Sequence, residues 1–130
     1  MTQTRNSQWI VRAGEARADF LQTGYAEHKL VPGLFGFSVQ FAPGKSVEEL
    51  ARAGRFRNAT ISYADLSDLQ TAVAVLSYRA DVIASPGTGY HHTFVVLYDM
   101  SNALLTQLPR PVAEAISNTF TRITNPHRVQ

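Results

Sequence analysis

Residues 35–41 contain the pattern that most restricts the fold of this chain. Large apolar side chains alternate there with small or polar ones: Phe35, Phe37, Val39 and Phe41 against Gly36, Ser38 and Gln40. Successive side chains of a strand point to opposite faces, so this period of two predicts a strand with one core face and one small, polar face. The run 94–98 is apolar at every position, which is typical of a central strand buried on both faces. Two such strands require a sheet at the centre of the fold.

Helical signals separate the strands. Residues 15–22 favour a helix that ends near Gly24, and Ser46 with Glu49 forms a capping box for a helix that runs to Gly54. Asp65 is the expected N-cap of a third helix, whose apolar stripe consists of Leu66, Leu69, Val73 and Leu76. A fourth helix is predicted from Pro111 to Asn125, with its apolar face formed by Val112, Ala115, Ile116, Phe120 and Ile123. Further strands are expected at 9–13, 59–63 and 81–84.

The resulting order βαβαβαββα predicts an α+β fold. We expect a single globular domain over residues 1–130, with a central, mainly antiparallel sheet of about five strands and helices packed on it. A chain of 130 residues with 45% hydrophobic residues suits one such domain, and it contains no linker or internal repeat. Charged residues make up 17% and form no run, which excludes a disordered or acidic tail.

The basic residues are mostly arginine. Twelve basic against ten acidic residues give a net charge of +2, and Lys29 and Lys45 are the two lysines. Guanidinium groups bind planar anions such as phosphate and carboxylate, although a GC-rich genome would produce the same bias. The basic clusters are small: Arg52, Arg55 and Arg57, and Arg122, His127 and Arg128. They are compatible with contacts to RNA or a nucleotide and too small for a dedicated DNA-binding surface.

Several classes of site and segment are not expected. The chain has no cysteine, which excludes disulfides and cysteine-based zinc sites. His91, His92 and Asp99 lack any recognised metal-ligand spacing, so we predict no metal site. A signal peptide and a membrane segment are not expected, because the first residues are polar and the longest apolar runs, 72–76 and 94–98, are short.

His91 and His92 are the candidate catalytic residues. They follow the glycine-rich turn 85–89 at the start of the expected central strand, and a histidine there can act as acid or base near neutral pH. Neighbours on a strand face opposite sides, so one would face a cleft and the other would pack. The apolar Phe94 and Val96 on the His92 side favour His91 for the cleft. The alternative is that both histidines are structural.

Arg12 and Ser38 are the candidate ligand-binding residues. If their strands are neighbours, one groove is lined by Arg12, Gly36, Ser38 and Gln40. Arg12 would bind an anionic ligand, for which the missing side chain of Gly36 leaves room. The alternative is an ordinary solvated face with an exposed arginine. No phosphate-loop lysine or Gly-x-Ser-x-Gly elbow is present, which argues against a P-loop and a serine hydrolase.

The segments 11–14 (Val-Arg-Ala-Gly) and 36–39 (Gly-Phe-Ser-Val), with Phe20 and Gly24 between them, resemble the opening of ADP-ribosyltransferase toxin domains. The resemblance implies an NAD pocket in which Arg12 holds the phosphate or ribose and Ser38 shapes the nicotinamide side. That family carries its catalytic glutamate in a Gln/Glu-x-Glu pair on a late strand. This chain has no such pair, since its last acids are Asp81, Asp99 and Glu114.

The strand 36–39, the turn 85–93 and the closing Asn125-Pro126 also resemble small C-terminal domains of bacterial polymorphic toxins and secreted effectors. This resemblance implies a module secreted or translocated as part of a longer chain, with a cognate immunity protein as partner and a target protein or RNA as substrate.

Residues 90–94 separately resemble the histidine-bearing final strand of barnase-like ribonucleases. The implied alternative is a metal-independent ribonuclease in which His91 or His92 is the acid or base and Arg55 or Arg57 stabilises the phosphate charge. A third alternative is a non-enzymatic module whose groove binds a partner peptide.

Overall fold

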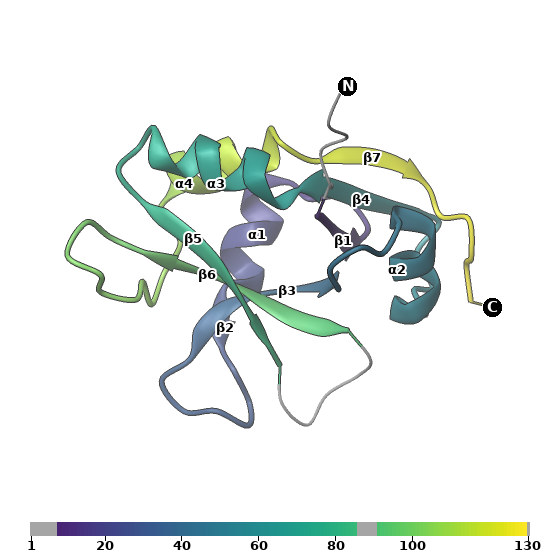
Figure 1. Ribbon diagram of the computed structural model, residues 1–130, viewed down its shortest axis with the longest axis horizontal. Helices are drawn as coiled ribbons and strands as arrows, with labels where there is room; N and C mark the ends of the chain where they lie inside the picture. Colours follow the sequence, from purple (N-terminus) through teal and green to yellow (C-terminus); the bar gives the residue numbers. More distant parts are fainter. Residues whose placement is uncertain (1–7, 86–90, 130) are drawn as a thin grey trace, which may run out of the picture.

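The computed structural model describes residues 8–85 and 91–129, which fold into four helices and an open sheet of seven antiparallel strands (Figure 1). The elements follow in the order β1 (Trp9–Ala13), α1 (Ala18–Gly24), β2 (Ala26–Glu27), β3 (Phe35–Phe41), α2 (Val47–Gly54), β4 (Thr60–Asp65), α3 (Leu66–Ala74), β5 (Arg79–Ala84), β6 (His92–Tyr98), α4 (Arg110–Ser117) and β7 (Thr121–Thr124). The α+β fold is as expected from the sequence. The predicted turn 85–89 falls, apart from Ser85, outside the described residues.

The strands lie in the order β5-β6-β3-β1-β4-β7, and the short β2 pairs with β3. The two strands with the clearest sequence patterns, β3 and β6, are neighbours inside the sheet, in the register Phe37↔Val95 to Gln40↔His92. Phe37 and Val39 are buried as the alternation predicted, and Phe94 to Leu97 are buried on both faces of β6. The patterned strands therefore form the centre of the sheet.

Two strands were not expected from the sequence. β2 lies in the segment 25–33 that was predicted as loop, where Ala26 and Glu27 pair with β3. β7 replaces the end of the fourth helix, which stops at Ser117. Residues 121–124 pair instead with Thr60–Tyr63 of β4. Thr and Ile are β-branched and favour an extended backbone, and the edge of β4 offers them unpaired main-chain groups, which explains why the strand prevails over the helical period.

The helices cover the two faces of the sheet unequally. Helices α1, α3 and α4 pack on one face, where Leu21, Leu69 and Ile116 join the main core. On the other face α2 covers a small cluster of Val11, Leu50, Ala51 and Ile61. α2 lies beside β1 and β4 at one end of the molecule (Figure 1). Among the described helices only α2 lies on this face, so part of it over β3 and β6 is left open.

Local signals set the ends of α2 and α3. The Ser46 hydroxyl accepts from the Glu49 N–H at 3.1 Å and the Glu49 carboxylate accepts from the Ser46 N–H at 3.2 Å, which confirms the capping box. Asp65 caps α3 by accepting from the Ser67 N–H at 2.8 Å.

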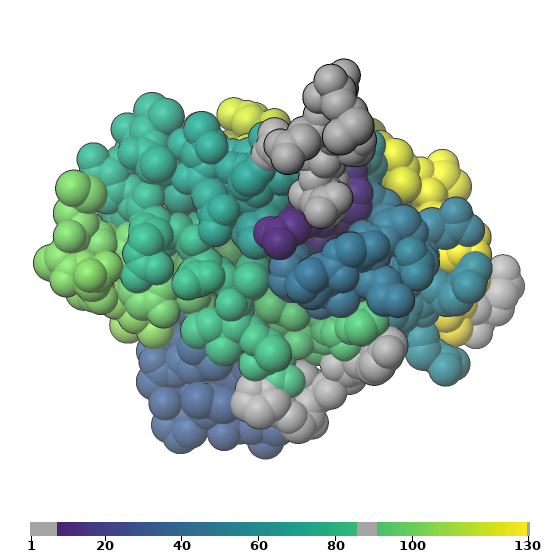
Figure 2. Space-filling model, viewed as in Figure 1, coloured from purple at the N-terminus to yellow at the C-terminus, as the bar shows by residue number. Residues whose placement is uncertain are grey.

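The connection between β2 and β3 projects from the sheet, as Figure 1 and the space-filling view in Figure 2 both show. It forms one wall of the site described next.

Candidate functional site

The sheet opens between β1 and β3. β1 pairs with β4 along its whole length, from Trp9 to Ala13. With β3 it shares only the pairs Ile10↔Phe41 and Val11↔Gln40. At the other end of β3, Gly36 pairs with β2. Between these two pairings a gap is left beside β3, at the level of Ser38.

Arg12 lies in this gap. Its Nη1 donates to the Ser38 carbonyl at 2.7 Å, and its Cζ lies 5.4 Å from the centroid of the Phe37 ring. Burial lowers the pKa of Arg12 from its ordinary value, but the guanidinium stays a cation at neutral pH. Within residues 8–85 and 91–129, Arg12 takes part in no ion pair. A half-buried cation without a carboxylate, and with N–H donors to spare, is suited to an anionic ligand.

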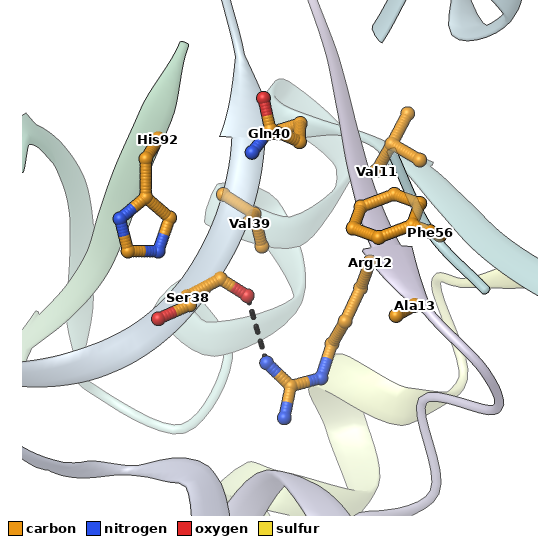
Figure 3. Close-up of a pocket in the computed structure, with 8 residues that line it drawn as sticks. All are labelled: Val11, Arg12, Ala13, Ser38, Val39, Gln40, Phe56 and His92. Carbon is orange, nitrogen blue, oxygen red and sulfur yellow. Dashed lines mark hydrogen bonds between the residues drawn. The ribbon is translucent and has the colours of Figure 1, made fainter. Parts of the chain in front are cut away.

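Arg12 and Ser38 line one hollow, as the sequence predicted if their strands were neighbours. The hollow has a volume of about 240 Å³, and its wall consists of Val11, Arg12, Ala13, Ser38, Val39, Gln40, Phe56 and His92 (Figure 3). Arg12 lies toward one end and Gln40 toward the other (Figure 3). The hollow therefore has a cationic end and an end formed by an amide.

A second hollow, of about 400 Å³, shares Ser38 and His92 with the first. Its other lining residues are Gly24, Ala26, Glu27, His28, Lys29 and Phe94. Because the two hollows share these residues, the hollows adjoin each other on the face of the sheet that α2 leaves open. Together they offer room for a ligand with two parts, such as a dinucleotide.

His92 stands between the two hollows. It is the first residue of β6 and pairs with Gln40, and its ring makes an edge contact with Phe94 at a centroid distance of 6.2 Å. Burial, and to a smaller degree the repulsion that nearby His28 exerts when both rings are protonated, lowers the pKa of His92 below its ordinary value. His92 is therefore neutral at pH 7 and is suited to accept a proton.

His28 is a buried histidine that sequence reasoning did not single out. Its Nδ1 accepts from the Leu30 N–H at 2.9 Å, which places the proton of the neutral ring on Nε2. Nε2 then donates to the Ser85 hydroxyl. In this tautomer His28 cannot take a proton from Ser85, so the pair is not a nucleophile with its base. A lone histidine outside any periodic run gives no sequence signal for this position.

His91 lies apart from Arg12 and Ser38. It precedes β6 with a φ of 61°, and its carbonyl accepts from the Phe41 N–H at 3.0 Å. Its side chain lines another hollow, with Lys45, Glu49, Arg52 and Ala53. We expected the two histidines to face opposite sides of the sheet as neighbours on one strand. This expectation was wrong, because His91 precedes the strand and is not part of it. The structure brings His92, and not His91, to the predicted ligand-binding residues.

Three further positions differ from the sequence-based expectations. Gly36 lines neither of the hollows beside Ser38. A Cβ there would lie 2.5 Å from the Val95 carbonyl oxygen, so the missing side chain serves the close approach of β6 and not a ligand. Arg55 and Arg57 are exposed and also line neither hollow, although Phe56 between them does.

Glu27 supplies a carboxylate that the sequence did not indicate. It lines the second hollow, and its Oε2 accepts from the Gly33 N–H at 2.9 Å. It comes from the short strand β2, which had no pattern of its own in the sequence. Among the described residues that line these two hollows, Glu27 is the one with an acidic side chain.

Comparison with family models, curated proteins and solved structures finds no match for this chain. Among the described residues, no three histidine or acidic side chains form a group that could hold a metal ion. None of the described helices has the length and apolar character needed to cross a bilayer.

Proposed function

We propose that the two adjoining hollows bind NAD or a related nucleotide, in a toxin or effector domain with an ADP-ribosyltransferase-like scaffold. The observation that carries the proposal is the guanidinium of Arg12, half-buried in the gap between β1 and β3 without an ion-pair partner among the described residues. Ser38 lies beside it on the neighbouring strand, which is the arrangement that the resemblance to ADP-ribosyltransferase toxins implies. Phosphate oxygens of the ligand would accept from the free donors of Arg12.

The second hollow supplies groups for chemistry on the bound ligand. Transfer of ADP-ribose breaks the bond between nicotinamide and ribose. The bonding electrons leave with nicotinamide, and positive charge develops on the ribose. A carboxylate stabilises such a charge, and Glu27 has one at this wall. Neutral His92 would take the proton of the attacking water or target group.

Calorimetric titration with NAD tests the binding step. We expect Arg12→Gln to weaken binding roughly tenfold to hundredfold, the usual effect of losing hydrogen bonds from a charged donor. Arg110→Gln is the matched control, because Arg110 pairs with Glu114 on α4 and lines neither hollow. The absence of heat at millimolar NAD would refute the proposal.

Incubation with labelled NAD tests the chemical step through release of nicotinamide or labelling of a target. We expect Glu27→Gln to bind NAD as the wild type does and to lose turnover. Loss of binding and turnover together would assign Glu27 to binding instead of chemistry.

A metal-independent ribonuclease is the second candidate. It is favoured by a neutral histidine and a guanidinium in one hollow, His92 and Arg12, in place of the exposed Arg55 or Arg57. RNA cleavage that survives EDTA and is lost in His92→Ala, without NAD binding, would select it. A peptide-binding module would show neither activity and would retain a partner in a pull-down.

A further inference from the structure

Gln40 carries a buried acceptor that the protein itself does not use. The side chain is 7% exposed, and its Oε1 is buried without a hydrogen-bond partner among the described residues. Buried amides are nearly always hydrogen-bonded, since burying an unpaired polar atom costs free energy. An apolar side chain of the same size would fit the free protein better. The amide at this position therefore points to a use other than stability.

Gln40 lies where it can meet a ligand. It pairs with Val11 on β1 and with His92 on β6, and it lines the first hollow. In Figure 3 its amide lies at the end away from the Arg12 guanidinium, with its nitrogen on the side of His92 and its oxygen turned away from the other lining residues. The rings of Phe56 and His92 belong to the same wall. The hollow thus combines two flat rings, the apolar ring of Phe56 and the imidazole of His92, with one amide.

On the basis of the proposed function, we infer that Gln40 recognises the carboxamide of the nicotinamide ring. The glutamine Nε2 donates to the carboxamide oxygen, and a rotation of the side-chain amide brings Oε1, which is buried and turned away from the hollow in the free protein, round to accept from the carboxamide nitrogen. An amide pair of this kind supplies the partner that Oε1 lacks in the free protein. The ring then lies between Phe56 and His92 while Arg12 holds the phosphates, and the nicotinamide–ribose bond lies toward His92 and Ser38, the residues shared with the second hollow that holds Glu27. Gln40 is thereby the residue that selects the ring.

The inference predicts opposite effects of one substitution on stability and on binding. Gln40→Met replaces the unpaired amide by an apolar chain of similar shape, so its melting temperature should equal or exceed that of the wild type. Its affinity for NAD should fall about tenfold. Gln70→Met is the matched control, because the Gln70 amide donates to the Ala80 carbonyl at 3.1 Å and lies outside both hollows. That control should melt at a lower temperature and bind NAD unchanged.

A ligand analogue makes the assignment specific. 3-Acetylpyridine adenine dinucleotide has a methyl group in place of the carboxamide nitrogen and keeps the rest of NAD. Calorimetry should show the wild type and Gln70→Met binding NAD about tenfold more tightly than the analogue, whereas Gln40→Met should bind the two alike.

The outcomes separate this inference from the proposed function. If the wild type binds NAD and the preference over the analogue is the same in Gln40→Met, the role of Gln40 is refuted and the nucleotide site stands. A melting temperature of Gln40→Met as low as that of Gln70→Met would also refute it, since the amide would then be structural. If the wild type binds neither dinucleotide, both proposals fail.

Discussion

Gly24 sets the position of Arg12. It is the last residue of α1, and a Cβ built on it would lie 2.6 Å from Arg12 Nη2. Non-bonded atoms of this kind need about 3.5 Å, so in Gly24→Ala the guanidinium must retreat by about 1 Å. Such a shift breaks the 2.7 Å hydrogen bond to the Ser38 carbonyl. The substitution therefore moves the cation and leaves the other lining residues of the first hollow in place, while its methyl group also enters the second hollow, which Gly24 lines.

The effects on stability and on binding differ in size. Alanine is favoured over glycine in a helix by about 0.5–1 kcal/mol, which offsets part of the lost hydrogen bond. The hydrogen bond of the guanidinium is itself worth about 1.5–3 kcal/mol, so the free energy of unfolding should fall by about 0.5–2.5 kcal/mol. A misplaced guanidinium loses a hydrogen bond to an anion, worth about 1.5–3 kcal/mol, so the affinity for NAD should fall roughly tenfold to hundredfold.

Calorimetry with NAD and urea denaturation measure the two effects in Gly24→Ala. Thr23→Ala is the control, because it changes the same helix turn and its hydroxyl bonds only to the Asp19 carbonyl among the described residues. Binding by Gly24→Ala as tight as that of Thr23→Ala would contradict this prediction. It would mean that the position of Arg12 beside Gly24 has no role in binding.

Three further predictions follow from contacts near the site. Gly36→Ala should lower the free energy of unfolding by about 1–3 kcal/mol, because its Cβ would meet the Val95 carbonyl; an unchanged urea midpoint would contradict this. Burial raises the pKa of Tyr25 to about 12, so stability should fall as pH rises from about 10 toward 12, and Tyr25→Phe should lack that part of the fall in a pH series of melts. His92→Ala should weaken NAD binding with little change in melting temperature, whereas His91→Ala should bind normally; similar titrations for both would refute the placement of His92 in the site.

The sequence patterns predicted those helices and strands that are determined by residues within the same segment. The alternation around Phe37 requires a half-buried strand whatever its neighbours are, and the capping box at Ser46 satisfies the first turn of α2 from within the same segment. Residues 121–124 show the opposite case. Their apolar spacing continues that of α4, and only the distant edge of β4 decides that they form a strand. The local pattern of residues 121–124 gives no indication of a partner strand about 60 residues earlier in the sequence.

The candidate site was predictable in part for the same reason. Arg12 and Ser38 could be paired from the sequence, because both lie on strands with recognisable patterns. Glu27 and His28 reach the site through the two-residue strand β2 and the connection that follows it, which carry no periodicity. The direction in which the His91 side chain points depends on the positive φ of this residue. A glycine in the sequence is a signal for positive φ, whereas a histidine is not.

An NMR titration with NAD shows whether the gap between β1 and β3 is the nucleotide site that we propose. The Nε–H signal of Arg12 and the side-chain amide of Gln40 report on the two ends of the hollow, and Arg110 on α4 serves as the reference. We expect saturable shifts at Arg12 and Gln40 and none at Arg110. Shifts that leave Arg12 and Gln40 unchanged and gather around His91 and α2 would contradict it.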